Sequence, residues 1–187
     1  MRGFLAAAFA CVLCMRATPA RAIASEALLD TLQHSAFQYF WNEANPANGL
    51  VKDRNTAQSV CSIASTGFGL SAICIGVDHG WVTRDAGRTR VLTTLQTFYN
   101  GAQSSAASGT IGYQGLFYHW LDMNTAQRTW DSELSTIDSA LLFAGILDAR
   151  QFFGGADPAE VQIRFLADSL YRRANWNFAR NLGAGIF

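Results

Sequence analysis

Apolar residues along this chain follow two patterns, and both are typical of helices. In residues 25–41, 83–99 and 157–170, apolar side chains recur every three or four positions and so form one stripe along a helix. In residues 59–76 and 141–147 they cover every face, which is expected only of a helix that is buried all round. The predicted order is therefore amphipathic, buried, amphipathic, buried, amphipathic.

Polar residues stand where these helices should begin. Ser25 and Thr83 precede two of the amphipathic stretches and can cap them. Ser135 is followed three positions later by Asp138, which is the spacing of a capping box. Residues 157–160, Asp-Pro-Ala-Glu, supply a cap, a proline at the first helical position and an acid in the first turn.

The alternation of helices predicts an all-α fold. An α/α toroid needs one inner-wall helix and one outer helix from each hairpin, and an ordinary helical bundle is the alternative. About five helices cannot close such a ring, so the pattern indicates a partial toroid. A short β-hairpin is also predicted near residues 116–130, with a turn at 122–126.

Residues 1–22 have the features of a signal peptide. A basic start is followed by the apolar run 3–14 and by Ala20-Arg21-Ala22, after which cleavage is expected. The apolar run is too short to span a bilayer. Lipidation at Cys11 is the alternative. The remaining chain, residues 23–187, is predicted to be one domain that is exported to the periplasm or secreted and has no membrane contact after cleavage.

The composition excludes several classes of protein. Of the 187 residues half are hydrophobic, which predicts one packed core, and 14 basic residues balance 14 acidic ones. Without a positive field, nucleic acid is not expected as a partner. Cys61 and Cys74 fall in one predicted helix about 20 Å apart, too far for a disulfide, so both are predicted to be buried and unpaired. The spacing of potential ligands predicts no metal site.

Residues 67–72, Gly-Phe-Gly-Leu-Ser-Ala, match the spelling of a dinucleotide fingerprint. That motif needs a strand before it and a second strand after it, whereas residues 81–90 turn directly into another helix. We therefore predict no cofactor. Glycines that allow two helices to approach closely are the better interpretation.

Three carboxylates lie at the start of the second buried helix: Asp131, Glu133 and Asp138. Glycoside hydrolysis uses a pair of carboxyl groups, one protonated and one ionised. Asp138, in the first helical turn, is favoured in its charged form, whereas burial beside Trp130 should raise the pKa of Glu133 and suit it to donate a proton. The alternative is that Asp138 only caps the helix and Glu133 is solvated.

Aromatic and polar residues alternate just before these acids. Tyr118, His119, Trp120 and Asp122 offer flat rings beside hydrogen-bonding groups, which is the composition of a carbohydrate subsite. The alternative is a hairpin that faces the core and satisfies His119 internally.

Three strings resemble the bacterial glucoamylase-like domain family: SIASTGFGL at 62–70, GLFYHWLD at 115–122 and DSELSTIDSALL at 131–142. The family includes endo-β-1,2-glucanases and related domains of cyclic glucan synthases, and its fold is an (α/α)6 toroid. The resemblance runs from about residue 28 to 178. Because members are more than twice this length, the chain looks like a truncated N-terminal portion.

The resemblance implies a glycoside hydrolase that acts on a β-linked glucan, and specifically on β-1,2-glucan. It places the acids in a cleft at the mouth of the toroid together with Asp53, Arg54, Tyr118 and His119. Glu133 or Asp131 is then the candidate acid and Asp138 an ionised orienting group, and the fragment alone is expected to be inactive. A non-catalytic carbohydrate-binding or accessory module is one alternative, and a structural helical protein that binds no glucan is another.

Overall fold

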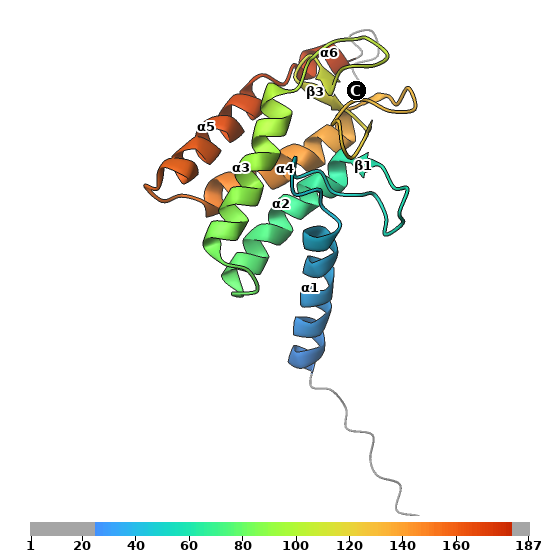
Figure 1. Cartoon of the computed structure of the whole chain (residues 1–187). Helices are drawn as coiled ribbons and strands as arrows, with labels where there is room; N and C mark the ends of the chain where they lie inside the picture. Colours follow the sequence, from blue (N-terminus) through green and yellow to red (C-terminus); the bar gives the residue numbers. More distant parts are fainter. Residues whose placement is uncertain (1–24, 181–187) are drawn as a thin grey trace, which may run out of the picture.

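The computed structural model of the chain describes residues 25–180, and most of these residues are helical (Figure 1). The long helices are α1 (Ser25–Asn42), α2 (Ile63–Asp78), α3 (Arg84–Asn100), α4 (Thr136–Phe152) and α5 (Pro158–Arg172), and the single turn α6 (Trp176–Ala179) follows them. The prediction of an all-α fold with about five helices is confirmed. The predicted signal peptide, residues 1–22, lies outside the described residues and stays a prediction.

Local sequence determines where several helices begin. Thr83, Ser135 and Asp157 are the N-cap residues of α3, α4 and α5, and the side-chain oxygen of each accepts a hydrogen bond from a backbone N–H of the first turn. The three predicted helix starts are therefore confirmed.

The helices form two groups that pack on one another. The inner helices α2 and α4 lie against each other, α3 and α5 lie side by side against this pair, and α1 packs on α2 (Figure 1). This arrangement matches the predicted alternation of outer and inner helices. The core between them consists of fully buried side chains such as Leu70, Leu95, Phe98, Leu142 and Phe153.

Glycines set the close contact between the two inner helices. A Cβ atom added at Gly145 would overlap the backbone carbonyl of Gly67, and one added at Gly67 would overlap the backbone at Leu141 and Leu142. The glycine at the start of the dinucleotide-like string is thus explained by helix packing, as predicted.

Two predictions about burial are wrong in part. Helix α2 was expected to be buried all round, but Phe68 and Ile75 are 51% and 45% exposed, because they line an open groove between α1 and α2 that α1 covers only in part. The apolar stripe of α1 is buried only at Phe37, whereas Leu28 and Leu32 are exposed where the helix extends away from the others (Figure 1).

Cys61 and Cys74 are free and buried, as predicted, but they do not share one helix. Cys61 lies in a short strand, and α2 begins only at Ile63, so the predicted helix start at residue 59 is wrong. Burial raises the pKa of each thiol to about 12, which leaves both protonated and unreactive at neutral pH.

Short strands connect the helices at the end of the molecule where α2 and α4 begin. They are β1 (Cys61–Ser62), β2 (Gly112–Tyr113), β3 (Leu116–Tyr118), β4 (Trp120–Leu121) and β5 (Leu134–Ser135). Strand β1 pairs with β4, and β3 lies between β2 and β5, all antiparallel.

The predicted hairpin at 116–130 is present in a short form. An antiparallel bridge joins Leu121 and Arg128, and the backbone N–H groups of Asp122 and Thr129 donate to the carbonyls of Gln127 and Trp120 at 2.8 and 3.1 Å. Residues 116–118 pair with β2, which precedes them in a tight hairpin, and with β5, which lies farther along the chain. No helix in the described part of the chain is long and apolar enough to cross a membrane.

Candidate active site

The register of β3 and β5 brings His119 beside Glu133. Tyr118 is paired with Leu134, so the next residues along the two antiparallel strands face each other, and the backbone N–H of His119 donates to the carbonyl of Glu133 at 3.1 Å. The side chains then meet, with 2.7 Å between His119 Nδ1 and Glu133 Oε1. Two residues fourteen positions apart are joined in this way by strand pairing.

Asp138 reaches the same imidazole from the first turn of α4. Its Oδ2 lies 3.8 Å from His119 Nε2, so the two ring nitrogens face different carboxylates. The hydroxyl of Ser135 donates to Asp138 Oδ2 and accepts a hydrogen bond from the Asp138 backbone N–H at 3.1 Å. The helix cap therefore fixes the side chain of Asp138, which is only 15% exposed.

Glu133 has a pKa below its ordinary value. Partial burial raises the pKa, but the hydrogen bonds from its own backbone N–H and from His119, together with the charge of Arg128, lower it further than burial raises it. The expectation that the pKa of Glu133 is raised is wrong, because the contact of His119 with this carboxylate could not be foreseen from the sequence. Its assignment as a catalytic residue stays a prediction.

Asp131 does not join this cluster. Its side chain is 78% exposed and forms an ion pair with Arg128, at 2.9 Å between the carboxylate and Nη2. Of the three predicted acids, the structure therefore brings together Glu133 and Asp138.

Aromatic rings extend from the acids toward a small pocket. The imidazole of His119 stacks on Trp120 with 3.8 Å between ring centroids, and Trp120 meets Trp130 edge-on at 6.2 Å. Both tryptophans line a pocket of about 250 Å³ together with Asp53 and Arg54. The pairing of β1 with β4 brings the loop of residues 53–60 to this end of the molecule. The predicted site residues Asp53, Arg54 and Trp120 therefore share one pocket with Trp130.

Two predicted sugar contacts have structural roles in this arrangement. Tyr118 is only 5% exposed, its hydroxyl donates to the carbonyl of Ser104, and Arg128 lies over its ring, so its side chain cannot touch a sugar directly. Asp122 accepts hydrogen bonds from Asn124 and Thr125, which hold the turn after β4; the backbone N–H of Thr125 is the main cause of its lowered pKa.

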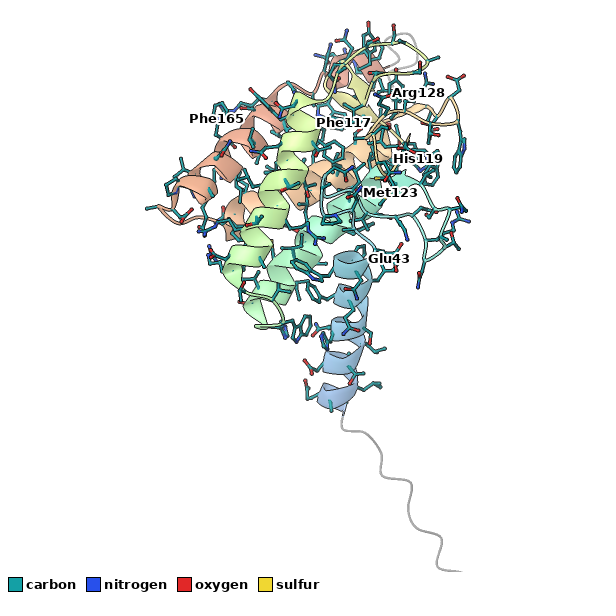
Figure 2. All side chains as sticks on the ribbon, in the orientation of Figure 1. Glu43, Phe117, His119, Met123, Arg128 and Phe165 are labelled. Carbon is teal, nitrogen blue, oxygen red and sulfur yellow. The ribbon has the colours of Figure 1, made fainter. Side chains whose placement is uncertain are left out.

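A second, polar cleft of about 500 Å³ lies on the other side of the 56–60 loop. Glu43 and Lys52 form an ion pair of 2.7 Å in it, and Asp122 and Met123 form part of the opposite wall. Figure 2 shows Glu43, Met123 and His119 on the side of the molecule that carries the loops. Sequence patterns did not single out Glu43 or Lys52, because neither belongs to a recognisable motif.

The acid cluster also has the donor types of a cation site. One ligand atom from each of His119, Glu133 and Asp138 lies within 4.8 Å of the other two, although their sequence spacing predicted no such group. His119 Nδ1 and Glu133 Oε1, however, are hydrogen-bonded to each other at 2.7 Å, whereas Asp138 Oδ2 at 3.8 Å from Nε2 is beyond hydrogen-bond distance. In this arrangement His119 and Glu133 are thus paired with each other.

Comparison with known proteins relates this chain to glucan-degrading enzymes. Over 159 residues the chain is 30% identical to an exo β-1,2-glucooligosaccharide sophorohydrolase of Parabacteroides distasonis, a match that covers 82% of this chain and 21% of that protein. A glucoamylase-like protein from Bacteroides uniformis has the same fold over 83% of this chain and 37% of its own, with 31% identity and a TM-score of 0.74. The resemblance to glucoamylase-like glucanases is confirmed.

A solved β-1,2-glucanase from Parabacteroides distasonis gives a similar result. Its TM-score is 0.73 at 28% identity, and the match covers 83% of this chain and 22% of the glucanase. The chain thus spans about a fifth of the length of the curated relative, and its helices correspond to part of the glucoamylase-like toroid. No family model matches the chain.

Proposed function

We propose that this chain forms part of the substrate cleft of a glycoside hydrolase that acts on a β-1,2-linked glucan. The observation that carries the proposal is the triad of Glu133, His119 and Asp138 next to a pocket with two tryptophans. Relatives that are similar over four-fifths of this chain are named for hydrolysis of β-1,2-linked glucose oligomers, which supports the same substrate class.

Each group in the proposed site has a distinct task. The ionised carboxylate of Glu133 can accept a proton or stabilise positive charge at the sugar ring, and Asp138 orients it through His119. In the pocket, the Asp53 carboxylate can accept hydrogen bonds from sugar hydroxyls and the Arg54 guanidinium can donate them.

We further propose that the 187 residues alone bind the glucan without cleaving it. Hydrolysis needs a protonated carboxyl group on one side of the glycosidic bond and an ionised one on the other. In this cluster the lowered pKa of Glu133 suits it to the ionised role, and a protonated partner is not identified among the residues that the structure describes. By itself the chain would then act as a carbohydrate-binding module.

Calorimetry and product analysis test both parts. We expect the full chain to bind a linear β-1,2-linked glucose oligomer saturably and to bind an α-1,4-linked oligomer of equal length more weakly. Absence of binding to any glucan would overturn the proposed function. Release of oligosaccharides from linear β-1,2-glucan by the purified chain would overturn the proposal that it is inactive alone.

A further inference from the structure

Trp130 combines a large apolar surface with an exposed position. Its side chain is 70% exposed, the highest value among the large hydrophobic residues of the part of the chain that the structure describes. An indole is usually found at least partly covered by protein, so such exposure indicates a surface that contacts something else. Trp130 stands at the rim of the pocket that also holds Trp120, Asp53 and Arg54.

The backbone at Trp130 is in an unfavourable conformation. Trp130 has φ = 57° and Asp131 has φ = 53°, so two consecutive residues with side chains occupy the left-handed region. This region costs free energy for residues other than glycine, and such conformations persist where the surrounding structure holds them and often mark functional sites.

Arg128 holds this strained turn. Its guanidinium donates to the carbonyl of Ser132 at 2.7 Å and to the carbonyl of Asp131 at 3.0 Å, and it also pairs with the Asp131 carboxylate. Arg128 is itself fixed over the ring of Tyr118, 4.2 Å from its centroid. The direction of the Trp130 side chain is therefore imposed by several contacts and is not a feature of a free loop.

The indole of Trp130 is connected to the acids by stacked rings. It meets Trp120 edge-on, Trp120 stacks on His119, and His119 contacts Glu133. A ligand lying on Trp130 would thus be one step along a continuous surface from the triad. The two charged residues of the pocket, Asp53 and Arg54, pair with each other at 2.7 Å, which leaves the pocket without net charge and suits a neutral ligand.

We propose that Trp130 is a stacking platform for one pyranose ring of the glucan. The apolar face of the sugar would lie on the indole, and its hydroxyls would reach Asp53 and Arg54. This inference rests on the proposed function, since it names the residue that holds a sugar unit beside the triad.

The test uses the full chain and a linear β-1,2-linked glucose oligomer. In ¹⁵N spectra the five tryptophans of the chain give separate indole signals, and we expect that of Trp130 to shift on titration while that of Trp81 does not. Trp81 packs between His34 and His79 near the far end of α2, so it is the internal control.

Substitutions give the quantitative part of the test. Trp130→Ala should weaken binding at least tenfold by calorimetry, Trp130→Phe should retain most of the affinity, and Trp81→Phe should match the unaltered chain. Because the Trp130 side chain is exposed, its loss should leave the thermal unfolding midpoint nearly unchanged. The phenylalanine variant keeps the test valid if the alanine variant folds poorly.

The possible failures are distinguishable. If the unaltered chain binds the oligomer and Trp130→Ala binds it equally well, the platform is refuted and the proposed function stands. If the unaltered chain does not bind the oligomer at all, both are refuted.

Discussion

The carboxylate of Glu133 is subject to opposing influences within a few ångströms. Partial burial favours its protonated form, whereas the hydrogen bonds from its own backbone N–H and from His119 favour the ionised form and prevail. The pKa of this residue therefore depends on a neighbour that strand pairing supplies, and it should change when that neighbour is removed.

His119→Ala should raise the pKa of Glu133 toward the ordinary value of a glutamate, because it removes the hydrogen bond and the positive charge that stabilise the carboxylate. The measurement is a pH titration of the side-chain carboxyl ¹³C signal of Glu133. Glu160 is the control, since its lowered pKa depends first on Arg84. An unchanged Glu133 midpoint would show that His119 is not the cause.

The site could be identified from the sequence only in part. The acids at 131, 133 and 138 could be found because a capping pattern and an acidic string are local features. The sequence does not reveal which of these acids lie close together, because their positions depend on the β3–β5 register and on the strained turn at Trp130. Neither feature leaves a periodic pattern in the sequence.

At the scale of elements, the contact between α2 and α4 depends on two glycines. Gly145→Ala places a methyl group against the Gly67 carbonyl, and since backbone cannot yield as a side chain can, the helices must move apart. We expect a loss of about 1–3 kcal/mol in the free energy of unfolding, measured by urea denaturation. Gly154→Ala is the matched control and should change stability by less than about 0.5 kcal/mol, because an added Cβ there has only ordinary contacts.

Helices α3 and α5 are tied together by a buried carboxylate. Glu160 is 3% exposed and accepts hydrogen bonds from Arg84 Nε at 2.7 Å and Nη2 at 3.0 Å, and from the backbone N–H of Gly155 at 2.7 Å. The bond from Arg84 is the main reason that the pKa of Glu160 is lowered. This side chain therefore favours folding in its ionised form.

Glu160→Gln should lower the free energy of unfolding by about 1.5–3 kcal/mol at neutral pH, since it removes charge-assisted hydrogen bonds. Because the pKa of Glu160 is lower in the folded than in the unfolded chain, its contribution is complete above the ordinary glutamate pKa of about 4.3 and is lost as the pH falls through the folded value. Denaturation measured at several pH values should therefore show that the free energies of unfolding of the two proteins become similar in acid.

A comparison with Asp85→Asn isolates the effect of burial. Asp85 pairs with Arg88 on the surface of α3 and is 80% exposed, so its substitution should change stability by no more than about 0.5 kcal/mol. The two proteins, Glu160→Gln and the unaltered chain, should differ in their free energy of unfolding. If this difference stayed constant down to strongly acidic pH, it would contradict the role assigned to the charge of Glu160.

Helices were predictable from the sequence to a degree that strands were not. The caps at Thr83, Ser135 and Asp157 act within one turn, so the residues that form them are adjacent in the chain. Strands of two or three residues show no alternation, and the pairings β1–β4 and β3–β5 join segments that lie far apart in the sequence. The sequence therefore indicated the scaffold well and the connections that shape the site poorly.

An apolar groove lies on the surface of the molecule between α1 and α2. A cavity of about 280 Å³ is lined there by Phe37, Phe40, Phe68 and Ile75 together with smaller residues, and the last two side chains are about half exposed. Farther along α1, Leu28 and Leu32 are also exposed. Contiguous apolar surface of this kind favours association in water, since burial against another molecule removes it from solvent.

We expect the purified chain to self-associate with rising concentration, and the double variant Phe68→Gln, Ile75→Gln to do so less. The substitutions remove apolar area at the rim of the groove, and glutamine is compatible with a helix, so the fold should be retained. Sedimentation velocity over a range of concentrations measures the change. Val161→Gln on α5 is the control, because Val161 is similarly exposed but lies outside the groove. Equal association of the double variant and the unaltered chain would mean that the contact is made by another face, for which the exposed Phe165 on α5 would be the next residue to replace.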